Sequence, residues 1–235
     1  MKRIVVFGLA ALVLLPAVDS AFAQDEDWIR FPYRVAVSLE GGIGMPLQPT
    51  EFNDLWNASF PLSFAVGYAI MPRVEVKGWI TYAKWGISTI PAKEAIGVLG
   101  VTEISGGSIT TLFYGVSAKI NPFPNSRLMP YIEVGGGYFQ SSGDDLTVTR
   151  EGTGIYTPLS LTNSMADASG PAFLGVFGME YAFNELWNVY TELDYYIGFD
   201  DSFAPGDLVR DQNDPPAEGG HIHIATVVLG IILKF

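Results

Sequence analysis

The feature that most constrains this chain is a two-residue alternation of apolar side chains with small or polar ones, which recurs in eight separate runs. Successive side chains of a β-strand point to opposite faces, so each run predicts a strand with one apolar face. After the N-terminus no apolar run approaches the roughly 20 residues of a spanning helix, whereas runs of about ten residues suffice for a tilted spanning strand. The runs cover residues 35–44, 59–70, 74–82, 111–120, 132–138, 173–181, 189–197 and 225–235.

The connections between these runs are alternately short and long. The short ones cover residues 71–73, 121–129 and 184–187, and the long ones cover 45–57, 89–106, 143–169 and 201–219. Short turns at one end and long loops at the other are typical of outer-membrane barrels. The sequence therefore predicts an all-β fold, an eight-stranded antiparallel up-and-down transmembrane β-barrel over residues 34–235. A soluble β-sandwich or barrel, which shares the strand length and turn spacing, is the alternative.

Composition narrows the class further. Apolar residues make up 49% of the chain, yet 16% of its residues are charged, as expected where each strand shows lipid only every second residue. The absence of cysteine excludes disulfides and thiolate metal sites. A formal net charge of −12 without a basic stripe argues against nucleic acid as a partner.

The N-terminus has the three regions of an export signal in order. Met1, Lys2 and Arg3 form a basic start, residues 4–18 are apolar, and Ala21-Phe22-Ala23 is a small-x-small site before Gln24. This pattern predicts a signal peptide over residues 1–23, cleaved after Ala23, rather than a membrane anchor. An acidic periplasmic segment over residues 24–33 would then precede the barrel.

Aromatic residues cluster near the expected strand ends, where amphipathic rings prefer the headgroup zone of a bilayer. We expect an inner girdle of Trp28, Phe31, Tyr33, Tyr181, Phe183 and Trp187, and an outer girdle of Trp56, Phe60, Tyr82, Trp85, Tyr138 and Tyr195.

The last run ends in Phe235 with apolar residues at every second position before it. It resembles the terminal strand of outer-membrane proteins. Residues 130–138 and 178–181 are likewise similar to strand segments of small barrels of the OmpA and OmpW types. The resemblance implies that Phe235, Leu233 and Ile231 form the signal that the barrel-assembly machinery reads. It also implies an outer-membrane location, without the periplasmic peptidoglycan-binding domain of full OmpA-type proteins.

The small or polar faces of the runs carry the charged residues that would point into the barrel. An eight-stranded interior is just wide enough for side chains to fill it, and buried charges are costly unless they are paired. We expect a network in which two lysines offset several of six carboxylates, leaving either a closed interior or a narrow cation-favouring path. Its members are Glu40, Glu75, Lys77, Lys119, Glu133, Glu180, Glu192 and Asp194.

Three functional hypotheses follow. The first is a structural or surface-interaction role through the long outer loops, with no enzymatic activity and no cofactor. The alternative is a narrow OmpW-type channel for ions or small hydrophobic molecules, and the third is a lipid-modifying enzyme. His221 and His223 lie on one strand face near Ser202 and are the candidates for a metal pair or a surface base, although no nucleophile motif accompanies them.

The expected partners are outer-membrane lipid and lipopolysaccharide, besides the barrel-assembly machinery, and we expect a monomer. Acidic outer loops could hold the divalent cations that bridge lipopolysaccharide, although acidic loops are more often simply solvated. The loop acids are Asp144, Asp145, Glu151, Asp167, Asp200, Asp201, Asp207, Asp211, Asp214 and Glu218.

Overall fold

The computed structural model contains a closed antiparallel β-barrel of eight strands. The structure describes residues 34–71, 73–88, 101–123, 126–150, 159–163, 167–200, 203 and 220–235. The predicted signal peptide and acidic segment, residues 1–33, lie outside the described residues. The predicted fold class, an eight-stranded up-and-down barrel, is confirmed, because every barrel strand pairs with its neighbours in chain order.

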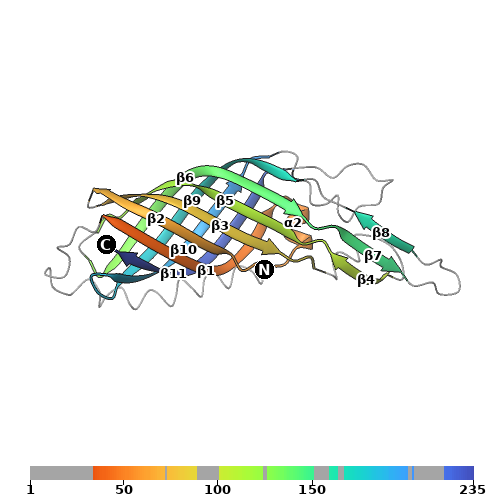
Figure 1. Ribbon diagram of the computed structural model, residues 1–235, viewed down its shortest axis with the longest axis horizontal. Coiled ribbons are helices and arrows are strands. Elements are labelled where there is room, and N and C mark those ends of the chain that lie inside the picture. The colour runs from red at the N-terminus through yellow and green to blue at the C-terminus, as the bar shows by residue number, and fades with distance from the viewer. Residues whose placement is uncertain are drawn as a thin grey trace.

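The barrel strands are ordered β1-β2-β3-β5-β6-β9-β10-β11, and β11 closes on β1 (Figure 1). Their bounds are β1 Val35–Gln48, β2 Leu62–Met71, β3 Val74–Trp85, β5 Ile109–Ile120, β6 Leu128–Gly143, β9 Ala168–Ala182, β10 Trp187–Gly198 and β11 Ile222–Lys234.

The pairing register fixes the geometry of the barrel. From Val35 on β1, successive Cα partners lead through the other seven strands and return to β1 at Met45, ten residues further along. Strand number, stagger and tilt are linked in a closed sheet, and barrels of this size have strands tilted by about 35–45°. The interior is therefore narrow and is lined by alternate residues of every strand.

Burial alternates along all eight strands as the sequence predicts. In β11, for example, Thr226, Val228 and Ile232 are buried, whereas Leu229 and Ile231 between them are exposed. The face assignments made from the sequence are confirmed for every run, including this last one, whose inner face is poorly polar.

The two ends of the barrel differ. The terminal end holds the start of β1, the end of β11 and the three short connections, while the opposite end, here called the loop end, holds the long ones (Figure 1). The predicted alternation of short and long connections is confirmed. The described residues include no helix that is both long and apolar enough to cross a bilayer.

The long loops carry structure that the sequence analysis did not predict. Helix α2, Thr50–Leu55, follows β1. Three short strands, β4 Val101–Gly106, β7 Leu146–Arg150 and β8 Leu159–Asn163, pair in the order β4-β7-β8. This second sheet projects beyond the loop end, where β4 leads into β5 and β7 follows β6 (Figure 1).

Candidate functional site

The interior of the barrel is the candidate site, because it holds the charged side chains of the strands. All eight residues of the expected network lie on inward-facing positions, and all except Glu40, which is half-buried, are buried. Since β-strands bring every second side chain to the same face, one inward register on each strand is enough to assemble the group. Seven of the eight fall into three centres, and the eighth, Glu75, is buried opposite Lys119 in the β3–β5 pair.

The first centre lies near the terminal end and is built around Glu180. One carboxylate oxygen accepts from Lys119 Nζ at 2.6 Å, and the other accepts from Lys234 Nζ at 2.5 Å and from the Asn188 amide. The Lys119 ammonium also lies 4.0 Å from the centroid of the Tyr131 ring, a favourable cation–π distance. Glu180 is 1% exposed and binds two ammonium groups that are themselves buried.

The second centre pairs Lys77 with Glu133. The Lys77 ammonium donates to one Glu133 oxygen at 2.7 Å, and the Ser117 hydroxyl donates to the other at 2.6 Å. Glu133 is 2% exposed. Both of its oxygens are therefore occupied, as a buried carboxylate requires.

The third centre consists of Glu40, Glu192 and Asp194, here called the carboxylate trio. One oxygen of each lies within 4.8 Å of one oxygen of the others. Each carboxylate accepts a hydrogen bond from a neutral hydroxyl. Tyr190 donates to Glu40 at 2.6 Å, Thr226 donates to Asp194 at 2.8 Å, and Tyr131 donates to Glu192.

Two glycines make room for the tyrosines that serve the trio. Gly178 lies opposite Tyr131 in the β6–β9 pair, and Gly230 lies opposite Tyr190 in the β10–β11 pair. A Cβ at either glycine would lie 2.3 Å from Cζ, the ring carbon that bears the tyrosine hydroxyl. The missing side chains thus let each ring lie across the neighbouring strand, with its hydroxyl directed at a carboxylate.

Toward the loop end the interior becomes apolar and filled. Six rings, here called the aromatic plug, are between 0% and 3% exposed, namely those of Phe52, Trp56, Trp85, Phe113, Phe139 and Phe203. Ring contacts run through the plug, with Phe113 stacked on Phe139 at 5.7 Å between centroids and Phe52 edge-on to Trp85 at 5.5 Å.

Helix α2 supplies part of this plug. Its Phe52 contacts rings of β3 and of the segment before β11, Trp85 and Phe203. The plug's indole groups are satisfied inside, because Trp85 Nε1 donates to Thr111 Oγ1 and Trp56 Nε1 donates to the Gly107 carbonyl, both at 2.9 Å. The first long loop therefore folds back into the mouth of the barrel.

The expected outer girdle needs correction at two positions. Trp56 and Trp85 are buried in the plug rather than placed at a lipid surface, because Trp85 lies on the inward register of β3 and Trp56 follows α2. The other four expected members are exposed near the loop end, and of the inner girdle Phe183 and Trp187 are exposed. Trp28, Phe31 and Tyr33 lie outside the described residues.

The histidine candidates lie on the outer wall at the loop end. His223 Nδ1 is 2.7 Å from the Tyr195 hydroxyl, and the exposed His221 ring packs edge-on to Phe199. Among the described residues, neither histidine belongs to a group of three that could hold a metal ion. Ser202 lies outside the described residues.

At the same rim, Asp144 makes an exposed ion pair with Lys84 at 3.3 Å. The pKa of Asp144 lies below its ordinary value. The main cause is a hydrogen bond from the Ser108 hydroxyl, and the Lys84 ammonium contributes to a lesser extent.

At the terminal end, the residues expected to form the assembly signal are accessible. Phe235 is 64% exposed, and Ile231 and Leu233 face outward on β11. Their reading by the assembly machinery stays a prediction.

Several polar members of the interior were not identified from the sequence. Lys234 is inward-facing and binds Glu180, so the network has three lysines rather than two. The alternation of the last run already put Lys234 on the inner face, and that was the signal that could have found it. The pairing of Tyr131, Tyr190 and Thr226 with particular carboxylates depends on contacts between strands and leaves no sequence signal.

The chain aligns with known proteins in structure but matches none of the compared ones in sequence. No protein-family model matches the chain, and no curated protein matches its sequence. Solved structures do align with most of it. Neisserial surface protein A aligns at 11% identity over 86% of this chain and 97% of its own, with a TM-score of 0.49. Ail of Yersinia pestis aligns at 10% identity over 87% and 100%, with 0.46. OprG of Pseudomonas aeruginosa aligns at 13% identity over 86% and 97%, with 0.45. At these identities and TM-scores the alignments do not indicate a function. The assignment of a barrel fold follows from the strand pairing of this chain.

Proposed function

We propose that this protein spans a bacterial outer membrane as a monomeric β-barrel with a closed interior, and that it acts through its loop end in a structural or surface-interaction role. The single observation that best supports a membrane location is the composition of the outer wall of the barrel. On the outward positions of the eight barrel strands, all of which the structure describes, Lys84 at the loop end is the only lysine, arginine or acidic residue. A soluble barrel would carry charged and polar residues over its outer face, because soluble proteins rarely expose so large a contiguous apolar surface.

The height of the apolar wall supports this proposal. On β10 the outward positions from Trp187 to Ile197 are apolar or threonine. Ten steps of about 3.4 Å at a tilt of about 40° give roughly 26 Å, close to the roughly 25 Å of a lipid-facing barrel band. Trp187 borders this band at the terminal end, and Tyr195 and Tyr138 border it at the loop end.

A protein reaches the outer membrane by export through the periplasm. We therefore further propose that residues 1–23 are removed and that the terminal end faces the periplasm. The mature chain would then begin at Gln24. Intact mass measurement of the protein purified from outer membranes should give the mass of residues 24–235, and the mass of the uncleaved chain would contradict this part of the proposal.

The role at the loop end is supported by the way the interior is filled. Near the terminal end the lysine–carboxylate pairs occupy the cross-section, and near the loop end the aromatic plug does. Trp79 and Tyr196 lie between them with ring centroids 5.9 Å apart. Among the described residues, the surface that projects beyond the barrel toward a partner is the sheet of β4, β7 and β8 at the loop end.

The decisive measurement is ionic current through planar bilayers that contain the folded mature protein. We expect no discrete conductance steps from the wild type, and none from Glu133→Gln or Glu192→Gln. A porin of known conductance in the same bilayer shows that the assay detects open barrels, and circular dichroism shows that each variant is folded.

Cation-selective steps that change in the two glutamine variants would overturn the closed interior and establish the narrow channel instead. Steps that are the same in wild type and variants would place a current path away from these carboxylates, which also contradicts the proposal.

A further inference from the structure

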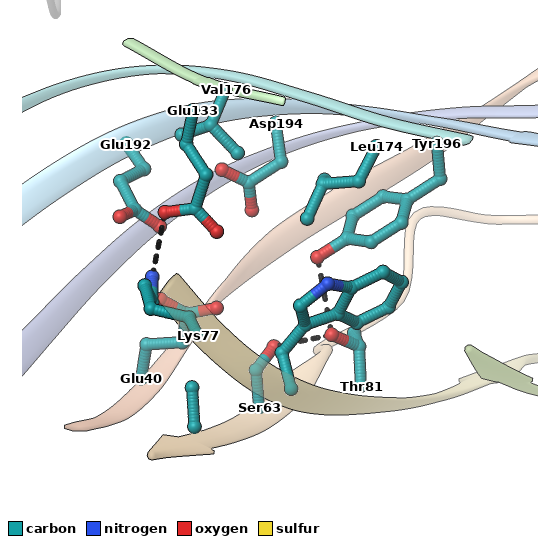
Figure 2. Close-up of a pocket in the computed structure, with 12 residues that line it drawn as sticks. Glu40, Ser63, Lys77, Thr81, Glu133, Leu174, Val176, Glu192, Asp194 and Tyr196 are labelled. Carbon is teal, nitrogen blue, oxygen red and sulfur yellow. Dashed lines mark hydrogen bonds and ion pairs between the residues drawn. The ribbon is translucent and has the colours of Figure 1, made fainter. Parts of the chain in front are cut away.

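The described hydrogen bonds of the interior lysines go to Glu180 and Glu133 and not to the carboxylate trio. Lys119 and Lys234 both bind Glu180, and Lys77 binds Glu133. The trio receives hydrogen bonds from the neutral hydroxyls of Tyr131, Tyr190 and Thr226. Lys77 lines the same cavity, but its hydrogen bond goes to Glu133 (Figure 2). Three carboxylates this close together, with no ammonium group among the described residues donating a hydrogen bond to them, require a further positive charge or protons.

A second observation points to a ligand at the same place. Asp194 is 1% exposed and lines the cavity, yet its Oδ1 has no hydrogen-bond partner among the described residues. Trp79 is also buried on the cavity wall, and its Nε1 likewise finds no partner there. A buried carboxylate oxygen left unsatisfied on a cavity wall is costly unless a polar group or an ion occupies the adjoining space.

The size and chemistry of the cavity select the kind of ligand. Its volume of about 10 Å³ corresponds to about one water-sized occupant. Glu192 and Asp194 enter from β10 and Glu40 from β1, so the carboxylates converge from two sides (Figure 2). Ca²⁺ takes oxygen ligands in flexible geometry, whereas Mg²⁺ requires a near-ideal octahedron and usually keeps several waters, for which there is no room.

We propose that Glu40, Glu192 and Asp194 bind one divalent cation of the Ca²⁺ class inside the barrel. Each carboxylate contributes at least one oxygen, and Asp194 Oδ1 becomes a ligand atom. The ion joins β1 to β10 in the part of the interior that also holds the Lys77–Glu133 pair.

The test measures metal content of the full mature protein purified from outer membranes in detergent. The protein is exposed to CaCl₂, desalted, and analysed by mass spectrometry for calcium per barrel. We expect about one tightly held Ca²⁺ in the wild type. In Glu192→Gln/Asp194→Asn we expect that calcium to be lost, or its affinity to fall about tenfold or more, because ligand charge sets Ca²⁺ affinity. Asp144→Asn, which removes an exposed loop acid, should retain it.

A second readout uses the wild-type protein alone and does not depend on the double variant folding. Tb³⁺ bound at the trio lies beside Trp79, so excitation of tryptophan in the wild type should sensitise its emission, and added Ca²⁺ should quench it. Wild-type protein that retains no more calcium than the double variant, or that gives no Ca²⁺-sensitive emission, overturns the proposal and leaves protons as the charge that balances the trio. Equal loss in Asp144→Asn would place the ion in the loops and overturn it too.

Discussion

Replacing Glu180 by leucine is expected to lower the free energy of unfolding by about 3–5 kcal/mol, which is the range for breaking one side of a buried ion pair. The carboxylate holds two ammonium groups, Lys119 at 2.6 Å and Lys234 at 2.5 Å, and leucine would remove this charge from beside both of them in the interior. The measurement is urea unfolding of the barrel in lipid vesicles, followed by tryptophan fluorescence.

The matched control for this experiment is Lys84→Met, which breaks the exposed ion pair with Asp144. We expect less than about 1 kcal/mol from that change, because exposed pairs contribute little. Glu180→Gln should fall between the two, since the amide keeps a hydrogen-bond acceptor but not the charge. A loss in Glu180→Leu no larger than in Lys84→Met would show that the two lysines find other partners.

Replacing Leu229 by arginine is expected to destabilise the barrel in a bilayer by about 2–4 kcal/mol, the range for arginine on a lipid face near the midplane. Leu229 is 69% exposed and lies midway along the outward face of β11. The sign of the effect discriminates between classes of protein. On a soluble barrel an exposed leucine would be replaced by arginine with little effect or with a gain in solubility.

The control is Gln140→Arg on the outward face of β6 near the loop end, where the depth dependence predicts about 0–1 kcal/mol. Both variants are compared with wild type by urea unfolding in the same vesicles. Equal effects at the two positions would contradict a lipid-facing band, as would a Leu229→Arg protein that stays in solution without detergent.

The two-residue period of a β-strand explains how much of the fold could be predicted from the sequence. Once the alternation is in register, one apolar residue such as Leu229 fixes the face of all its neighbours, and this held on every strand. The pairing of β2 with β3, β5 with β6 and β9 with β10 also followed, because short connections leave antiparallel neighbours little choice. The inward position of charged residues was predictable for the same reason.

Residues outside the alternating runs were beyond that reasoning. The pattern says nothing about a six-residue helix such as α2, nor about the short strands of the second sheet, because their burial depends on which loops meet beyond the barrel. Trp56 was misplaced on that account, whereas Trp85 continues the inward register of β3 three residues beyond the run read from the sequence. An aromatic near a strand end suits a membrane interface or an internal plug equally well, and only the folded loop decides between them.

The sequence by itself determined that this chain forms strands with one apolar and one polar face, that eight of them follow one another in antiparallel order, and which side chains point inward. These properties are local, since they depend on the strand period and on the lengths of the connections. The tertiary structure alone decided which inward groups meet. A stagger of ten residues around the barrel brings Glu40 of β1 beside Glu192 and Asp194 of β10, and Lys234 beside Glu180. Such contacts depend on the closure of the whole sheet, which no single strand encodes.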